Sequence, residues 1–243
     1  MKKKIKNIDI NYIRYGNNQK KTIVLLHGWG QNIEMMRPIG DNLQDSFDIV
    51  IIDLPGYGLS DEPDYVWTVY DYADAINDLL NSLKIKNPII IGHSFGGKIA
   101  LVYASKYTVE KLVLFGSPYR PEIQKLSLKT KLLKKMAKIK ILSPLVEIAK
   151  KHIGSTDYKN ASSMMRKILV ETVNLDITVD AKKIKCSTLL IWGEKDTAVP
   201  LERAYELEKL INDAGVVVYD ECTHYAYLER LNQTISILNS FLK

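Results

Sequence analysis

The pentapeptide Gly92-His93-Ser94-Phe95-Gly96 is the feature that most constrains the fold of this chain. It stands between a short apolar run at 88–91 and a helical stretch at 97–106. A strand, a tight turn and a helix in this order form a nucleophile elbow, which holds its serine in strained backbone geometry above the sheet edge. The alternative is a glycine-rich turn that only joins a strand to a helix, so the rest of the chain must decide.

Short apolar runs recur along the chain and are typical of parallel strands buried on both faces. They lie at 22–26, 49–52, 88–91, 112–115, 188–192 and 216–219. The start of the chain alternates apolar and polar residues instead. With Gly16-Asn17-Asn18 after it, this start predicts an antiparallel hairpin at a sheet edge.

Helical patterns separate these runs, most clearly at 68–83, where apolar residues recur at helical spacing. Thr68 and Asp71 form a start signal in which each side chain satisfies an unpaired backbone donor. Alternating strands and helices predict an α/β fold with a doubly wound, mostly parallel sheet and helices on both faces. Ligands of such sheets bind beyond the carboxyl ends of the strands, where Ser94 falls.

The alternation breaks between residues 119 and 183, a stretch with about three helical segments and no convincing strand. We therefore expect a core formed by 1–118 and 184–243, with 119–183 inserted as an all-helical cap, or lid, over the strand ends. Pro118-Tyr119-Arg120-Pro121 is the expected hinge. Three apolar stripes would build the interior of the cap: Leu126, Leu132, Leu133, Met136 and Ile139; Leu145, Val146, Ile148 and Ala149; and Met164, Met165, Ile168, Leu169 and Val173.

Charge and composition exclude several functional classes. The net charge is +6, and residues 119–180 carry 13 Lys or Arg against 6 Asp or Glu. No nucleic-acid reader motif accompanies this basic segment, so solvated lysines are the plainer interpretation. The composition, 46% hydrophobic and 26% charged residues, is ordinary for a globular protein. A chain of 243 residues is long enough for one large domain that needs no stabilising disulfide or metal ion.

Membrane and redox signals are weak. Lysines follow Met1, but the apolar stretch of a signal peptide does not, and no run approaches a membrane span. Cys186 and Cys222 lack the spacing of a zinc site and are expected to be reduced thiols. We therefore expect a cytoplasmic protein without integral membrane association. The sequence leaves its oligomeric state open.

A serine nucleophile needs a histidine base and an acid that fixes the histidine tautomer. Of the four histidines, His224 follows the last strand, where a loop can reach back over the sheet. Asp196 follows the strand at 188–192. The resulting order Ser94, Asp196, His224 is the one recorded for a single fold. The competing candidates are His27, His93 and His152 for the base, and Glu194, Asp220 and Asp53 for the acid.

An oxyanion hole needs two N–H donors aimed at one point. Phe95 follows the nucleophile and supplies one donor. The segment His27-Gly28-Trp29-Gly30 follows the strand at 22–26 at the same sheet end, so the Trp29 N–H is the natural second donor.

Together these motifs resemble the α/β-hydrolase superfamily nearly end to end. Further residues that carry the likeness are the segments 53–60 (DLPGYGLS) and 192–196 (WGEKD). The resemblance implies an eight-stranded, mostly parallel sheet, a helical cap, no cofactor and no metal. It assigns Ser94, Asp196 and His224 as a catalytic triad and Trp29 and Phe95 as oxyanion donors. One departure is Thr223, which stands where many members have glycine.

The expected function is a carboxylesterase-like serine hydrolase that cleaves a small-molecule carboxylic ester through an acyl-enzyme. A thioesterase, an amidase or a carbon–carbon bond hydrolase could use the same triad, the last with Arg37, Arg120 or Arg166 holding a carboxylate. The basic cap also makes an acidic substrate conceivable. A non-catalytic ligand-binding member of the fold and a membrane-surface module are the alternatives from other classes.

Overall fold

The computed structural model describes residues 1–18, 20–121 and 156–243. Eight strands form one sheet in the order β1-β2-β4-β3-β5-β6-β7-β8. Pairing is antiparallel between β1 and β2 and between β2 and β4, and parallel elsewhere. The strands are β1 (Lys2–Ile5), β2 (Ile8–Gly16), β3 (Thr22–Leu26), β4 (Asp48–Ile52), β5 (Ile89–His93), β6 (Lys111–Phe115), β7 (Ser187–Gly193) and β8 (Ala214–Tyr219). The predicted eight-stranded, mostly parallel α/β sheet is confirmed.

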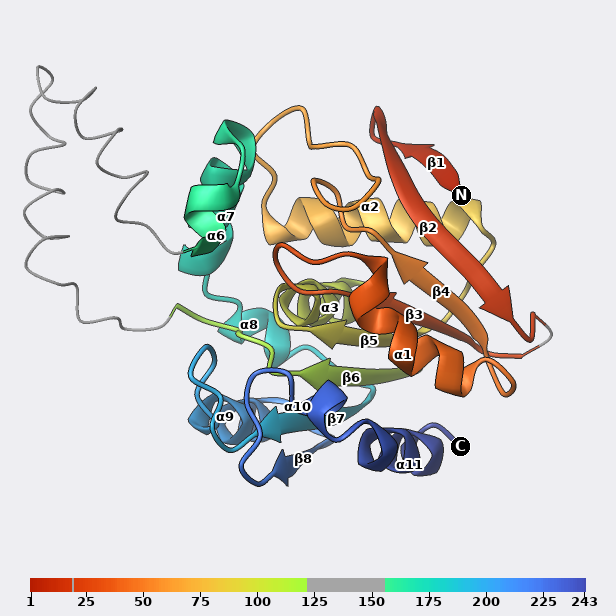
Figure 1. Cartoon of the computed structure of the whole chain (residues 1–243), viewed down its shortest axis with the longest axis vertical. Helices are drawn as coiled ribbons and strands as arrows, with labels where there is room; N and C mark the ends of the chain where they lie inside the picture. Colours follow the sequence, from red (N-terminus) through yellow and green to blue (C-terminus); the bar gives the residue numbers. More distant parts are fainter. Residues whose placement is uncertain (19, 122–155) are drawn as a thin grey trace, which may run out of the picture.

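Helices cover both faces of the sheet (Figure 1). Val24 and Leu26 of β3 face a core shared with α2, α3 and α9. The alternate residues Ile23 and Leu25 face a second core shared with α1 and α11. The period of two along a strand thus explains why these apolar runs are unbroken. The described helices are α1 (Ile33–Leu43), α2 (Val69–Ser82), α3 (Phe95–Lys106), α6 (Thr156–Asn160), α7 (Ser163–Asn174), α8 (Thr178–Ala181), α9 (Glu202–Leu210), α10 (Ala226–Glu229) and α11 (Leu231–Phe241).

Helix α2 begins as its sequence predicts. The Thr68 hydroxyl accepts a hydrogen bond from the Asp71 N–H, and the Asp71 carboxylate accepts one from the Thr68 N–H. This reciprocal capping satisfies two backbone donors that the first helical turn leaves unpaired. The helix then buries Tyr72, Ile76 and Leu79 against the sheet.

The edge hairpin turns at a different place from the predicted one. Its two strands are β1 and β2, and the turn lies at Lys6 and Asn7, not at Gly16-Asn17-Asn18. Both turn residues have positive φ, 47° and 69°, as a tight two-residue hairpin loop requires. The lysine-rich start of the chain is therefore an exposed edge strand. Lysines on such an edge discourage pairing with another chain.

Of the segment 119–183 proposed as a cap, residues 119–121 and 156–183 are described, and α6, α7 and α8 are its described helices. Its first two predicted apolar stripes, at 126–139 and 145–149, lie outside the described residues. The third stripe is a helix, α7, which buries Met165 and Ile168 and exposes Val173. Helices α6 and α7 lie beyond the carboxyl ends of the parallel strands (Figure 1).

Candidate active site

Ser94 occupies a strained turn between β5 and α3. Its φ of 51° and ψ of −114° lie outside the regions that a residue with a side chain normally occupies. Such strain costs on the order of 1–3 kcal/mol and persists only where the surroundings enforce it. Here the Ser94 N–H donates to the Phe115 carbonyl at 2.9 Å, and the Lys98 N–H donates to the Ser94 carbonyl at 3.0 Å.

The two glycines of the elbow permit a backbone approach that no side chain could. A Cβ at Gly92 would lie 2.6 Å from the Gly96 carbonyl oxygen. A Cβ at Gly96 would lie 2.4 Å from the carbonyl oxygen of Leu26, the last residue of β3. The start of α3 is therefore pressed against the end of β3. This contact brings Ser94 beside the turn that follows β3.

Asp196 and His224 form a hydrogen-bonded pair at the ends of β7 and β8. His224 Nδ1 lies 2.7 Å from Asp196 Oδ2. The other carboxylate oxygen, Oδ1, accepts from the N–H groups of Ala198 and Val199 at 2.9 and 2.8 Å. Asp196 is buried, and its three bonds fix the carboxylate. Since Nδ1–H donates to it, Nε2 of His224 carries the free lone pair.

This pair lies beside the Ser94 elbow. A Cβ at Gly116 would be 2.9 Å from His224 Nδ1 and 3.1 Å from Asp196 Oδ2, and Gly116 directly follows the residue that accepts from the Ser94 N–H. His93 Nε2–H donates to the His224 carbonyl at 3.1 Å, and the two imidazole centres are 4.8 Å apart. Within the described residues, no hydrogen bond joins Ser94 Oγ to the His224 imidazole. Such contacts commonly tighten only when substrate binds.

Two unpaired amides face the same end of the sheet. The Gly28–Gly30 turn contacts the elbow, since a Cβ at Gly28 would lie 3.0 Å from His93 Nδ1. The Trp29 and Phe95 rings pack edge to face at 5.2 Å. Within the described part of the chain, neither the Trp29 nor the Phe95 N–H has a hydrogen-bond acceptor. The arrangement can therefore offer two donors to an oxygen that develops negative charge near Ser94.

Known proteins match this fold and sequence. The family model of the α/β-hydrolase fold matches residues 21–127. The chain therefore has the α/β-hydrolase fold. An AB hydrolase superfamily protein, YisY of Bacillus subtilis, is 26% identical over 91% of each chain. A 2-hydroxy-6-oxononadienedioate/2-hydroxy-6-oxononatrienedioate hydrolase of Paraburkholderia phymatum is 27% identical over 89% of this chain and 86% of that one. The enol-lactonase of Burkholderia xenovorans superposes with a TM-score of 0.80 at 20% identity, covering 100% and 99% of the two chains.

The other candidate histidines hold loops in place. His27 is fully buried, its Nδ1–H donates to the Gly28 carbonyl at 2.7 Å, and its Nε2 accepts from the Leu54 N–H at 3.0 Å. Burial lowers the pKa of His27 to about 4 and that of His93 to about 3, the latter with a further contribution from nearby His224. Both imidazoles are therefore neutral at pH 7. His152 lies outside the described residues.

The competing acids are placed differently from Asp196. Glu194 is exposed, and its carboxylate accepts from the Glu221 N–H at 3.0 Å. Asp220 is also exposed. Asp53 is buried but accepts from the Asn11 side-chain amide and the Ile33 N–H, both at 2.8 Å, so it ties β2 to the start of α1. None of these three carboxylates contacts His224 within the described residues.

Thr223, the departure from the family pattern, has a local partner. Its N–H donates to a Glu229 carboxylate oxygen at 2.9 Å, and its hydroxyl donates to the other oxygen of that carboxylate. Two bonds from one side chain stiffen the loop that carries His224. The sequence offered Thr223 and Glu229 but no pattern that pairs them.

Sequence reasoning missed two buried groups near Ser94. Lys98, four residues further along α3, is only 2% exposed, and its Nζ donates to the carbonyls of Thr172 and Leu175 at 2.7 and 2.6 Å. Tyr57 packs edge to face on Trp29 at 5.3 Å, and its hydroxyl is buried. A polar residue at an inward position of the helix pattern was the available signal for Lys98. Tyr57 had none beyond its place in the segment 53–60.

The described residues offer no metal site, disulfide or membrane-spanning helix. In the described ranges, no three His, Cys, Asp or Glu side chains gather in a way that could hold a metal ion. Cys186 and Cys222 are both free thiols. None of the helices in the described ranges is long and apolar enough to cross a membrane.

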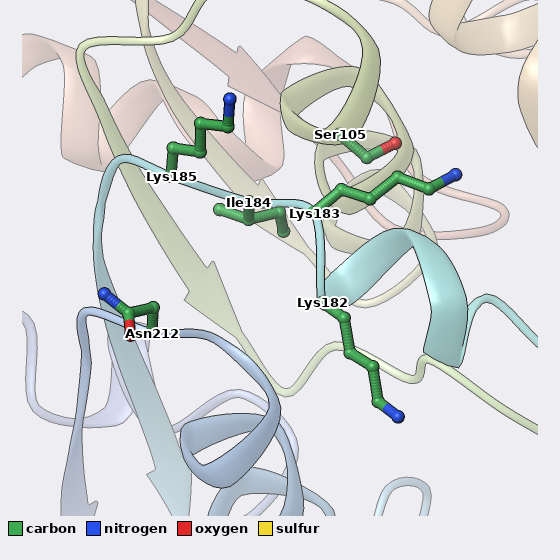
Figure 2. Close-up of a pocket in the computed structure, with 6 residues that line it drawn as sticks. All are labelled: Ser105, Lys182, Lys183, Ile184, Lys185 and Asn212. Carbon is green, nitrogen blue, oxygen red and sulfur yellow. The ribbon is translucent and has the colours of Figure 1, made fainter.

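A cavity of about 560 Å³ lies at the opposite end of α3 from Ser94. Its lining residues are Ser105, Lys182, Lys183, Ile184, Lys185 and Asn212. In Figure 2 the three ammonium groups point in different directions and do not converge on one point. Lys183 forms an ion pair with Asp180 at 3.0 Å. None of the described residues that line this cavity is a histidine that could serve Ser105 as a base.

Proposed function

We propose that this protein is a serine hydrolase that cleaves small carboxylic esters through an acyl-enzyme. The observation that carries the proposal is the Asp196–His224 hydrogen bond of 2.7 Å beside the strained Ser94 turn. A serine, a histidine and an oriented carboxylate meeting at the carboxyl ends of strands are the parts that acyl transfer needs.

Each group has one role in the proposed reaction. His224 Nε2 takes the Ser94 proton as Oγ attacks the ester carbonyl carbon, and the carbonyl oxygen gains negative charge. The Trp29 and Phe95 N–H groups hydrogen-bond that oxygen. Asp196 keeps the imidazole in the required tautomer and stabilises its charged form. The imidazolium then gives its proton to the leaving alcohol, and water attacks the acyl-enzyme by the same route.

Cleavage of a carbon–carbon bond is the second candidate, because a hydrolase of a dicarboxylate is among the similar proteins. That substrate would favour an arginine near Ser94. The three arginines considered from the sequence are occupied elsewhere: Arg37 pairs with Glu34, Arg120 with Glu206, and Arg166 donates to the carbonyls of Tyr158 and Lys159. These contacts favour the ester. A thioester or an amide fits the same groups, with no contact that prefers either.

The test is labelling by a fluorophosphonate probe, which reacts with an activated serine hydroxyl, in wild type and Ser94→Ala. We expect labelling that Ser94→Ala abolishes while Ser105→Ala leaves it intact. Turnover of p-nitrophenyl esters should follow the labelling. A folded wild-type protein that neither labels nor cleaves any ester, thioester or amide would instead be a binding member of the superfamily, and the proposal would be wrong.

A further inference from the structure

The Tyr57 hydroxyl is buried, and its proton has no hydrogen-bond acceptor among the described residues. Its ring is fixed from two sides, edge to face on Trp29 at 5.3 Å and on His27 at 5.6 Å. A buried hydroxyl without a partner is unfavourable, and most such groups in folded proteins are satisfied. The hydroxyl can therefore donate a hydrogen bond to a ligand atom that lies beside Trp29.

Asp157 faces the same place from the other side. It belongs to α6, and its Oδ1 lies 4.0 Å from the Cβ position of Gly30, which follows Trp29. Burial raises the pKa of Tyr57, and Asp157 is among the nearby groups that raise it further, while the Gly30 amide acts in the opposite direction. The Tyr57 hydroxyl, the Gly30 amide and the Asp157 carboxylate therefore lie close to one another.

Among the described residues, the charge at this location is negative. Burial raises the pKa of Asp157, and no described lysine or arginine offsets that shift. The nearest arginine along the chain, Arg166, donates to two backbone carbonyls and stacks on Tyr158 with 5.5 Å between guanidinium carbon and ring centre. Asp157 is exposed, so solvent screens part of its charge, but a substrate carboxylate placed here would still meet a like charge, which is unfavourable.

This location adjoins the reacting serine. Trp29 links the two, because its ring contacts Tyr57 on one side and Phe95, the residue after Ser94, on the other at 5.2 Å. A hydroxyl group on a substrate could donate to the Asp157 carboxylate and accept from the Tyr57 O–H. A methyl group could do neither, and a carboxylate would be repelled by Asp157.

We propose that Tyr57 and Asp157 form a subsite that selects esters bearing a hydroxyl group away from the reacting carbonyl, and that rejects carboxylates. This inference rests on the proposed role of Ser94. It opposes the expectation of an acidic substrate that the basic composition of residues 119–180 suggested, because the charge lining this part of the site is acidic.

The experiment compares kcat/KM for p-nitrophenyl esters of equal chain length that end in hydroxyl, methyl or carboxylate, over acyl chains of increasing length. Wild type should prefer hydroxyl to carboxylate by roughly tenfold at the best length, the order of one charge interaction at a partly exposed site. Asp157→Asn should raise kcat/KM for the carboxylate ester roughly five- to tenfold and leave the methyl ester unchanged. Tyr57→Phe should lower the hydroxyl ester to the level of the methyl ester.

Glu171→Gln, which removes an exposed carboxylate from α7, is the matched control and should change no ratio. Equal kcat/KM for the three esters in wild type, or ratios that neither Asp157→Asn nor Tyr57→Phe alters, would overturn the subsite. The neutral fluorophosphonate separates the two proposals. Labelling of Ser94 without this selectivity refutes only the subsite, whereas absence of labelling refutes the proposed function itself.

Discussion

Helix α3 connects two very different regions of the molecule (Figure 1). It runs from Phe95, directly after Ser94, to Lys106, so Ser94 and Ser105 lie near its two ends, about 16 Å apart at the rise of an α-helix. A cavity of about 560 Å³ lies at the Ser105 end, and three lysines line it. Yet Ser105 lies within the helix, and its hydroxyl donates to the Val102 carbonyl at 2.7 Å. The Ser94 end has a strained serine, two unpaired amides and an oriented histidine.

The Ser94 end differs from the Ser105 end in that side chains and backbone amides from several segments converge there, and this matters more for chemistry than the volume of a cavity. Segments from the ends of β3, β5, β6, β7 and β8 meet around Ser94 because parallel strands end at one edge of the sheet. The Ser105 end gathers lysines on one connection before β7, and these remain solvated side chains on a surface.

The largest expected effect is the contrast between the two serines. Ser94→Ala should lower kcat for a neutral ester by at least ~10⁴-fold, because it removes the nucleophile while leaving the oxyanion donors. Ser105→Ala should leave kcat unchanged. Steady-state kinetics on p-nitrophenyl esters measures both. Comparable losses in the two variants would end the distinction between the two ends of α3.

A slightly smaller loss is expected from Asp196→Asn, about 10³- to 10⁴-fold in kcat, since an amide can donate to Nδ1 and so favour the wrong imidazole tautomer. Glu194→Gln is the control, because it changes an exposed acid two residues earlier in the same loop. Kinetics with circular dichroism would check that both variants fold. A loss in Glu194→Gln equal to that in Asp196→Asn would contradict the assignment of the acid.

The strands and the turn at Ser94 could be predicted from the sequence, for definite physical reasons. The runs at 22–26 and 112–115 have one stable solution, burial on both sheet faces, and they became β3 and β6 almost residue for residue. The elbow at Ser94 was predictable because glycines two residues before and after the serine permit the close backbone approach that such a turn needs. The hairpin turn at Lys6 and Asn7 was not, since neither residue is a glycine and the positive φ values arise from strand pairing.

Contacts between segments distant in sequence were out of reach. Tyr57 and Asp157 are one hundred positions apart in the sequence. No local sequence pattern shows that the segments carrying them lie close together. The Lys98 bonds to Thr172 and Leu175 are of the same kind. The family resemblance proposes which residues carry the chemistry, and side-chain placement was needed to suggest which substrates they would accept.

Acid should weaken the Ser94 end of α3 before the Ser105 end. The pKa values of His27 and His93 are lowered by burial to about 4 and about 3, below the ~6.5 of an exposed histidine. Between pH 6.5 and 4 the unfolded chain therefore binds protons that the folded chain does not. The free energy of unfolding should fall with falling pH by up to about 1.4 kcal/mol per pH unit for each histidine.

Urea denaturation at pH 7, 6 and 5 measures this slope, and hydrogen exchange locates the first region to open. His27→Gln and His93→Gln should each make the slope shallower, because each removes one group that takes up a proton on unfolding. A slope that both variants leave unchanged, or earlier opening near Ser105 than near Ser94, would show that other groups control acid stability.

The smallest expected effect separates two lysines of α3. Lys98 is buried near Ser94, and its Nζ holds two carbonyls at the end of α7, whereas Lys106 at the far end pairs with Asp74 at the surface. Burial lowers the pKa of Lys98 to about 8, so at pH 7 its ammonium is still protonated and donates to both carbonyls. Lys98→Met should free α7 and speed hydrogen exchange in residues 168–178 severalfold, with a higher KM and little change in kcat. Lys106→Met should do neither, because an exposed ion pair contributes about 0–1 kcal/mol. If Lys98→Met leaves both exchange and KM at wild-type values, α7 is held by Met165 and Ile168 alone, and the buried ammonium has no part in positioning the wall that faces Ser94.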